Sequence, residues 1–237
     1  MLAITLINLA AREYQDVGFE RIAKNAAGAA ITNGANWLDL LNDAQRAVAI
    51  ARPDASATTA AVLLVAGTKQ SLPTGGFRLL DVSRNMGSTG LVAGDTIRLA
   101  ERDVQDMVAR SWHKNPVGTV IRDVFYNDKK DPLTFWVTPP VPSGGAVYIE
   151  ITYAKGPTDV TDADAGSITL SDTYATAMQQ WMLFRAYSMA TQALNQFQRA
   201  QFYFGAFFNV LGVKMKNDMW FSPNNPSINP PVANAAR

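Results

Sequence analysis

The sequence contains no cysteine and a single histidine, His113, and these absences exclude several kinds of site. Without cysteine the chain forms no disulfide bond, zinc–sulfur site or thiolate nucleophile, which is typical of a protein assembled in a reducing cytoplasm. A single histidine cannot build a histidine-rich metal cluster. A Ser-His-Asp triad around His113 stays formally possible, but no Gly-x-Ser-x-Gly turn accompanies it. We therefore interpret His113 as a solvated or capping residue beside Trp112.

An excess of either charge is also missing, because 21 basic and 20 acidic residues give a net charge of +1 and are mixed along the chain. A protein that binds nucleic acid by neutralising phosphates normally shows a basic excess or a basic run. The apolar stretch from Leu2 to Ala11 is too short to cross a bilayer and has no basic leader. We expect a near-neutral cytosolic chain without a membrane partner.

One acidic segment has part of the pattern of a calcium-binding loop. Asp162, Asp164 and Gly166, with the nearby Asp159, have some of the required spacing, but Thr173 stands where that loop needs a glutamate. A polar connection before the next helix is the preferred interpretation. The sequence predicts no catalytic residue, no cofactor and no metal ligand, so the protein is not expected to be an enzyme.

Hydrophobic periodicity predicts helices at both ends of the chain. The first region holds one helix within residues 2–11 and a second that begins at Trp37, with Asn36 as the N-cap and Pro53 as the stop signal. In the third region, Ser171 is the predicted N-cap of the next helix. These helices are expected to form a bundle.

The middle region, from about residue 58 to residue 153, shows the alternation of β-strands. Two segments each place apolar residues on one face. The first face is formed by Leu133, Phe135 and Val137, which alternate with Trp136, and the second by Val147, Ile149, Ile151 and Tyr153. Between the strands, residues 101–111 are predicted to form a short helix with Val104, Met107 and Val108 directed inward. The region is expected to be a mostly antiparallel β unit.

The last helix is apolar on more than one side, which exceeds what a single core contact needs. One side carries Phe197, Phe204, Phe208 and Leu211, and other sides carry Phe202, Tyr203 and Phe207. Two interpretations stay open: the helix is central in the bundle, or its second face meets another subunit. For the second interpretation, the candidate contact residues are Phe202, Tyr203 and Phe207.

Residues 221–237 contain four prolines and no charge before the terminal arginine, which favours an extended course. The segment is either a tail without fixed structure or an arm that becomes ordered on a partner. The arm candidates are Phe221, Pro223, Pro226, Ile228, Pro230 and Pro231. The predicted fold is therefore α+β: a helical bundle (1–56 and 158–220) with an inserted, mostly antiparallel β domain (57–157) and an extended C-terminal arm (221–237).

An ordered series of short motifs resembles the head-to-tail adaptor, or connector, proteins of tailed bacteriophages. The series covers about residues 37 to 213 and includes Leu41-Asn42-Asp43-Ala44-Gln45-Arg46, Arg52-Pro53-Asp54-Ala55, Gly67-Thr68-Lys69-Gln70, the run from Arg78 to Gly87, Arg102-Asp103, Trp112-His113, Asp131-Pro132, Pro139-Pro140, Asp172-Thr173-Tyr174-Ala175 and Arg185-Ala186-Tyr187-Ser188.

The resemblance implies a structural virion protein that forms a ring of about twelve copies under the portal, joins head to tail and lets DNA pass through its channel. The expected partners are further copies of the chain, the portal protein, a tail nozzle or tail-tube protein, and DNA that passes without specific binding. The expected location is the virion neck, between capsid and tail, after assembly in the host cytoplasm. The arm lies outside the matching series, and its binding to the portal is a separate hypothesis.

A different class of function stays open beside the adaptor. A carbohydrate- or nucleic-acid-binding module could use aromatic strand residues, namely Tyr126, Trp136 and Tyr148, as stacking platforms.

Overall fold

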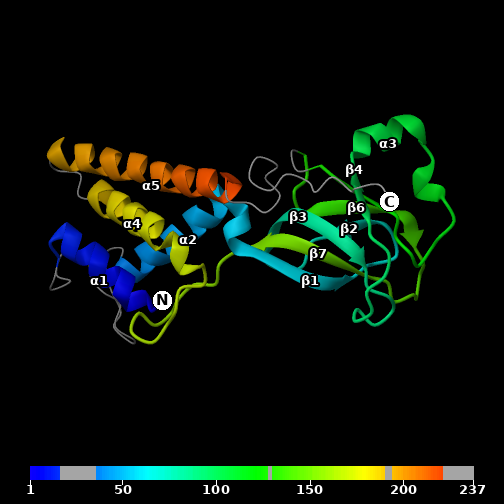
Figure 1. The fold of residues 1–237 in the computed structure, drawn as a ribbon, viewed down its shortest axis with the longest axis horizontal. Helices are drawn as coiled ribbons and strands as arrows, with labels where there is room; N and C mark the ends of the chain where they lie inside the picture. Colours follow the sequence, from blue (N-terminus) through cyan, green and yellow to red (C-terminus); the bar gives the residue numbers. More distant parts are fainter. Residues whose placement is uncertain (17–35, 128–129, 190–193, 221–237) are drawn as a thin grey trace, which may run out of the picture. The chain divides into compact units, whose positions relative to one another are not determined.

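The computed structural model describes residues 1–16, 36–127, 130–189 and 194–220, and Figure 1 shows their helices and strands. Over these residues the chain has five α-helices and two β-sheets, so the predicted α+β class is confirmed. Contacts between Cα atoms divide it into two compact units. The helical unit contains Met1–Val48 and the described residues from Thr158 onward, and the β unit contains Ala49–Pro157.

The helical unit contains α1 (Ala3–Tyr14), most of α2 (Trp37–Ala51), α4 (Ala175–Met189) and α5 (Leu194–Trp220). Helix α2 begins where the sequence predicts, because Asn36 Oδ1 accepts the Asp39 N–H at 2.7 Å and Asp39 Oδ2 accepts the Asn36 N–H at 3.5 Å. This reciprocal pair satisfies N–H groups that the first helical turn leaves unpaired. Ser171 likewise accepts the Thr173 N–H at the 3₁₀ turn Asp172–Tyr174, which leads into α4.

Aromatic packing and one buried carboxylate join α1, α2 and α4. The ring of Tyr14 lies 5.8 Å from that of Trp37 and 4.7 Å from that of Tyr187. The Trp37 indole donates to Asp16 Oδ2 at 3.1 Å, so the polar atom of this fully buried ring has a partner. Helix α2 also holds the segment before α4, because Asn42 exchanges two hydrogen bonds with the backbone of Val160.

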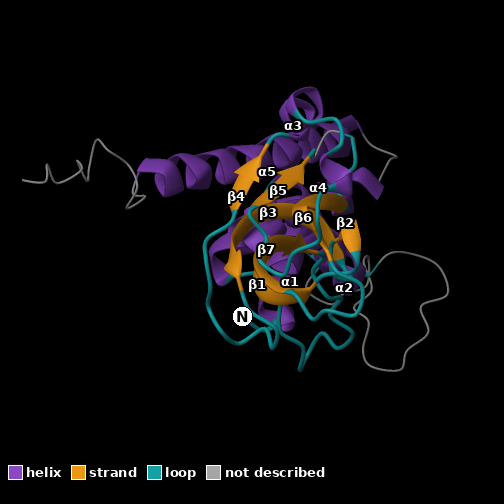
Figure 2. Ribbon diagram, turned by 90° about the vertical axis from the view of Figure 1, so that its right-hand side faces the viewer, coloured by secondary structure: helices purple, strands orange, loops and turns teal. Residues whose placement is uncertain are grey.

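The β unit is a sandwich of two sheets (Figure 2). The first sheet has the order β1-β7-β3 and is antiparallel; its strands are β1 (Ala57–Leu63), β7 (Tyr148–Lys155) and β3 (Gly76–Asn85). The second has the order β2-β6-β5-β4 and is antiparallel except for the parallel pair β4–β5. Its strands are β2 (Gly67–Ser71), β6 (Thr134–Val141), β5 (Asp123–Tyr126) and β4 (Arg98–Ala100).

The core of the sandwich follows the predicted alternation. Ile149 and Ile151 of β7 are fully buried, as are Phe135 and Val137 of β6, and all four belong to one cluster with residues of both sheets. Leu133 departs from the prediction, because it lies before β6 begins and is exposed.

Helix α3 (Arg102–Val108) faces the opposite way from the prediction. Val104, Met107 and Val108 are exposed, with Met107 at 82%, instead of directed inward. Polar residues hold the helix to the sheet: the Arg102 guanidinium lies 4.0 Å from the ring centroid of Trp136, and Asp106 accepts the Trp112 indole N–H at 2.7 Å. The orientation of α3 depends on an aromatic cluster of Trp112, Phe125 and Trp136, which the periodicity of so short a segment does not reveal.

Candidate interaction surface on the last helix

One side of α5 packs on α4, and its position is defined by three buried residues, Ala200, Phe207 and Leu211. These residues recur at steps of four and seven, so they share one face of the helix. The ring of Phe207 lies 4.9 Å from that of Trp181 on α4. Figure 1 shows α5 running back along α4. We call the apolar contact between the two helices, formed by these buried residues, the α4–α5 seam.

Tyr203 of α5 contacts both α1 and α4 through its side chain. Its hydroxyl donates to Glu13 Oε1 at 2.9 Å, and its ring stacks on Tyr187 at 5.4 Å. Burial, followed by the hydrogen bond and the negative charge of Glu13, raises the pKa of Tyr203 to about 12. Glu13 also accepts the Gln179 amide at 2.8 Å, so this carboxylate joins three helices.

The structure separates the three residues that the sequence proposes for a subunit contact. Phe202 is 69% exposed and could meet another chain. Tyr203 is half-buried and has its partners within the subunit. Phe207 is 1% exposed, so its assignment to a surface patch is wrong, because the ring fills the α4–α5 seam.

A continuous apolar stripe lies on α5 beside this seam. It consists of Phe197, Phe204, Phe208 and Met215, which we call the first stripe, and all four are exposed. At steps of seven, four and seven residues they stay on one helical face. The prediction placed the three phenylalanines together correctly but on the same side as Leu211, which is buried. An exposed row of aromatic residues on a folded subunit is typical of a surface that meets another chain.

Two glycines border the first stripe, Gly205 and Gly212, seven residues apart. A Cβ atom added at either position would meet no atom within 4 Å. In a helix interior, glycine is about 1 kcal/mol less favourable than alanine. The packing of the subunit therefore gives no reason for these residues. Sequence reasoning passed over them, although their spacing matches that of the apolar stripe.

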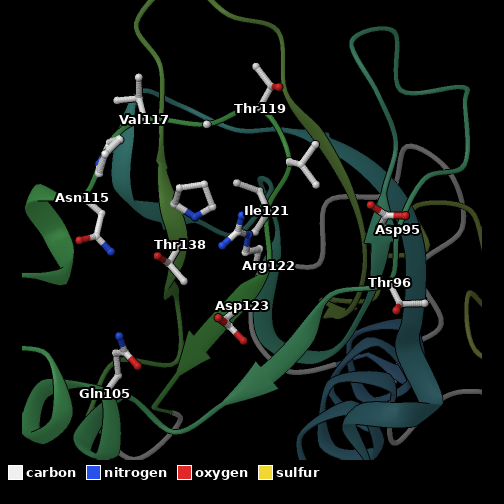
Figure 3. A pocket seen from close by; sticks show the side chains of 14 residues that line it. Asp95, Thr96, Gln105, Asn115, Val117, Thr119, Ile121, Arg122, Asp123 and Thr138 are labelled. Atoms are coloured by element: carbon white, nitrogen blue, oxygen red, sulfur yellow. The ribbon is translucent and has the colours of Figure 1, made fainter.

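An open hollow of the β unit is lined by both polar and apolar residues (Figure 3). It has a volume of about 860 Å³ and lies along residues 115–123, with Asp95 and Thr138 among its other lining residues. Buried Asn85 holds this segment, because its side chain accepts the Ile121 N–H at 2.8 Å and donates to the Ile121 and Asp95 carbonyls at 2.8 and 3.1 Å.

The aromatic residues proposed as stacking platforms are not part of this hollow and do not form an exposed row. Trp136 is 9% exposed, and Arg102 covers its ring. Tyr126 is half-buried, and its hydroxyl donates to the Pro132 carbonyl at 3.0 Å and accepts the Leu79 N–H at 3.2 Å. Tyr148 is half-buried as well. The binding module predicted from these residues lacks the open ring faces that base or sugar stacking requires.

His113 has the surroundings predicted for it. The imidazole is exposed, stacks on Trp112 with 3.6 Å between ring centroids, and its Nδ1 lies 2.8 Å from the Thr68 hydroxyl.

The acidic segment forms a turn. Asp162 Oδ1 accepts the N–H groups of Asp164 and Ala165, at 2.8 and 3.2 Å, and Asp159 pairs with Arg46. These carboxylates stabilise the polar connection before the next helix, which was preferred over a calcium-binding loop. Within the described ranges, no group of three or more side chains could hold a metal ion.

Two further predictions concern the chain ends and membranes. The arm candidates Phe221, Pro223, Pro226, Ile228, Pro230 and Pro231 lie outside the described residues. Among the helices that the structure describes, none is long and apolar enough to span a bilayer.

The helical unit thus exposes an apolar stripe on α5, and the β unit is a hydrogen-bonded sandwich of two sheets. The chain belongs to the SU10 adaptor protein family, a family of phage head-to-tail adaptors, which it matches over residues 1–227. The match includes the first 36 residues and part of the proline-rich segment, so the predicted extent of the resemblance was too short. A comparison with curated proteins gives no match.

Proposed function

We propose that this protein is a non-enzymatic neck subunit that forms a ring of about twelve copies under the portal, joins head to tail and surrounds the DNA passage. Membership of a phage adaptor family supports the structural role. The observation that carries the ring is the first stripe of α5. A subunit that leaves four large apolar side chains exposed on one helix face has a surface to cover, and further copies of the chain are always present to cover it.

The two compact units suggest a division of roles. We propose that the helical unit builds the ring as a bundle and that the β unit, inserted at residues 57–157, meets the portal or a tail nozzle or tail-tube protein. In this proposal the proline-rich arm, 221–237, docks on the portal. A proline-rich segment with no charge before its terminal arginine loses little conformational entropy on binding in an extended form and so suits this role.

The balanced charge of the chain supports the passage of DNA. With a net charge of +1 per subunit, the ring lacks the basic excess that would hold phosphates and slow the movement of DNA. In this proposal assembly and docking are the whole mechanism, and no covalent bond is made or broken.

The test is a mass measurement in solution, with and without portal protein. We expect a ring-sized assembly, alone or on the portal, and a chain that stays monomeric and binds no portal contradicts the proposal.

Deleting residues 221–237 tests the arm and is expected to weaken portal docking while leaving the subunit folded. The matched control keeps the same residues in shuffled order. Unchanged docking after the deletion removes the arm from the proposal.

A further inference from the structure

A second apolar stripe lies on α5, away from both the seam and the first stripe. It consists of Phe202 and Val213, both exposed, with half-buried Ala206 between them. At 3.6 residues per turn, its centre lies about 150° around the helix from the centre of the first stripe. Helix α5 therefore has three apolar sides, of which α4 covers one.

Two separate stripes match what a closed ring requires of each subunit. A head-to-tail ring joins two different patches, and each subunit presents one to either neighbour. The two stripes consist of different residues, so they provide the two different patches that a head-to-tail contact joins. In a ring of about twelve copies whose helices run parallel to the ring axis, the directions from one helix to its two neighbours form an angle of about 150°. The separation of the stripes agrees with this angle.

The size of the first stripe is adequate for the centre of such a contact. From their exposed fractions of 61%, 43% and 50%, Phe197, Phe204 and Phe208 present on the order of 300 Å² of ring surface. A stable interface buries about 800 Å² on each partner, with an apolar centre and a polar rim. Charge does not oppose a close approach, because the 27 residues of α5 include only four charged side chains, Arg199, Lys214, Lys216 and Asp218.

The strip of α5 between the two stripes differs from an ordinary solvent-facing helix surface. It consists mostly of amides and glycines, with one lysine and one methionine: Gln198, Gln201, Gly205, Asn209, Gly212, Lys216 and Met219. Exposed helix faces usually carry many charged residues. With Lys216 as its single charged side chain, this surface makes few strong contacts with phosphates. The open space at both glycines also gives the strip a low profile.

We infer that α5 is the channel helix of the ring: its first stripe packs on the second stripe of the neighbouring copy's α5, and the amide- and glycine-rich strip between them faces the passing DNA. The inference rests on the proposed ring function and names its contact and its inner surface. Gly205 and Gly212 then have a purpose, since they keep side chains out of the channel and allow close approach beside the first stripe.

Cross-linking tests the contact directly, because the chain contains no cysteine of its own. The double variant Val213→Cys/Met215→Cys places one thiol on each stripe at nearly the same height. Residues two apart point to different sides of a helix, so the two thiols of one chain cannot join. Oxidation is expected to give a series of covalent products up to the full ring. Each single variant is the matched control and is expected to give none.

The results of this experiment distinguish a failure of the α5 contact from a failure of the proposed ring. A normal ring mass with no covalent product in the double variant overturns the α5 contact and leaves the ring standing. Dimers from Met215→Cys alone, with nothing larger, show a two-fold contact and overturn it as well. Absence of any ring-sized assembly removes both proposals.

A maleimide-linked gold cluster on Asn209→Cys tests the channel face in the assembled ring. End-on electron micrographs are expected to show the gold inside the ring wall. Gold outside the wall overturns the assignment of the amide- and glycine-rich strip to the channel.

Discussion

Phe207 and Phe208 are adjacent phenylalanines of α5 in opposite environments, so replacing each by alanine separates subunit stability from subunit assembly. Phe207 is 1% exposed, and its ring lies 4.9 Å from that of Trp181. Phe208 is 50% exposed and belongs to the first stripe. The two variants have the same composition and change neighbouring positions of the same helix. Any difference between them therefore comes from the direction of the side chain.

The magnitudes follow from burial. Phe207→Ala removes a fully buried ring and leaves a cavity between α4 and α5, which lowers the free energy of unfolding by about 3–5 kcal/mol. Phe208→Ala removes a ring that keeps half of its surface in water, so the lost apolar burial corresponds to about 1 kcal/mol. The expected difference between the two variants is about 2–4 kcal/mol.

Urea unfolding of dilute protein, followed by the far-ultraviolet helix signal, measures the stability, and sedimentation velocity measures assembly. Dilution matters because assembly would itself stabilise the folded subunit. We expect Phe208→Ala to unfold near the original urea midpoint but to assemble less, and Phe207→Ala to unfold much earlier. Equal losses of stability in the two variants would refute the assignment of which face of α5 packs on α4. Normal assembly of Phe208→Ala would refute the role of the first stripe.

Three further predictions concern the β unit. Asn85→Ala leaves the backbone of Ile121 unpaired, so calorimetry is expected to show a loss of about 2–3 kcal/mol in the free energy of unfolding, and a negligible loss contradicts the stabilising role of these hydrogen bonds. The hydrogen bond from Trp112 lowers the pKa of Asp106 below 3.8, so the stabilisation from this contact is full above pH 3.8 and is lost as the pH falls through the lower folded value. The Trp112 indole N–H resonance should report that midpoint, with no such step in Asp106→Asn; a midpoint at or above 3.8 contradicts it. Met107→Ser should change the unfolding free energy by less than about 0.5 kcal/mol, whereas a loss of several kcal/mol would restore the inward orientation that periodicity predicts.

The sequence predicted best those elements whose determinants are local. The cap of α2 is a single residue, Asn36, and its partner lies three positions later, so the start of the helix could be located from the sequence. The alternation around Ile149 and Ile151 is equally local, because a strand with one buried face repeats every two residues. Strand β2 (Gly67–Ser71) was missed because its determinant is not local. It is an edge strand of mostly polar residues, and only its pairing with β6 defines it.

The candidate surface was harder to predict, because a helix with apolar residues on several sides does not show which side is covered. For α5 the choice is made by α4 and by the tether from Tyr203 to Glu13, which lies 190 positions away in the sequence. Together they turn Phe207 inward and leave Phe208 exposed. Helix α3 is a second example, since Arg102 and Asp106 find partners on Trp136 and Trp112 that no local pattern contains.

The arrangement of α5 also has a consequence for how the proposed ring would assemble. If each contact joins the first stripe of one copy to the second stripe of the next, an open arc of any length leaves one stripe of each kind uncovered at its ends. Closure covers both stripes and adds no further copy, so the last contact forms without the loss of translational freedom that each earlier one requires. Partial rings are then disfavoured relative to both the free subunit and the closed ring. An adaptor needs this property, because an arc that stays open would leave the DNA passage unsealed.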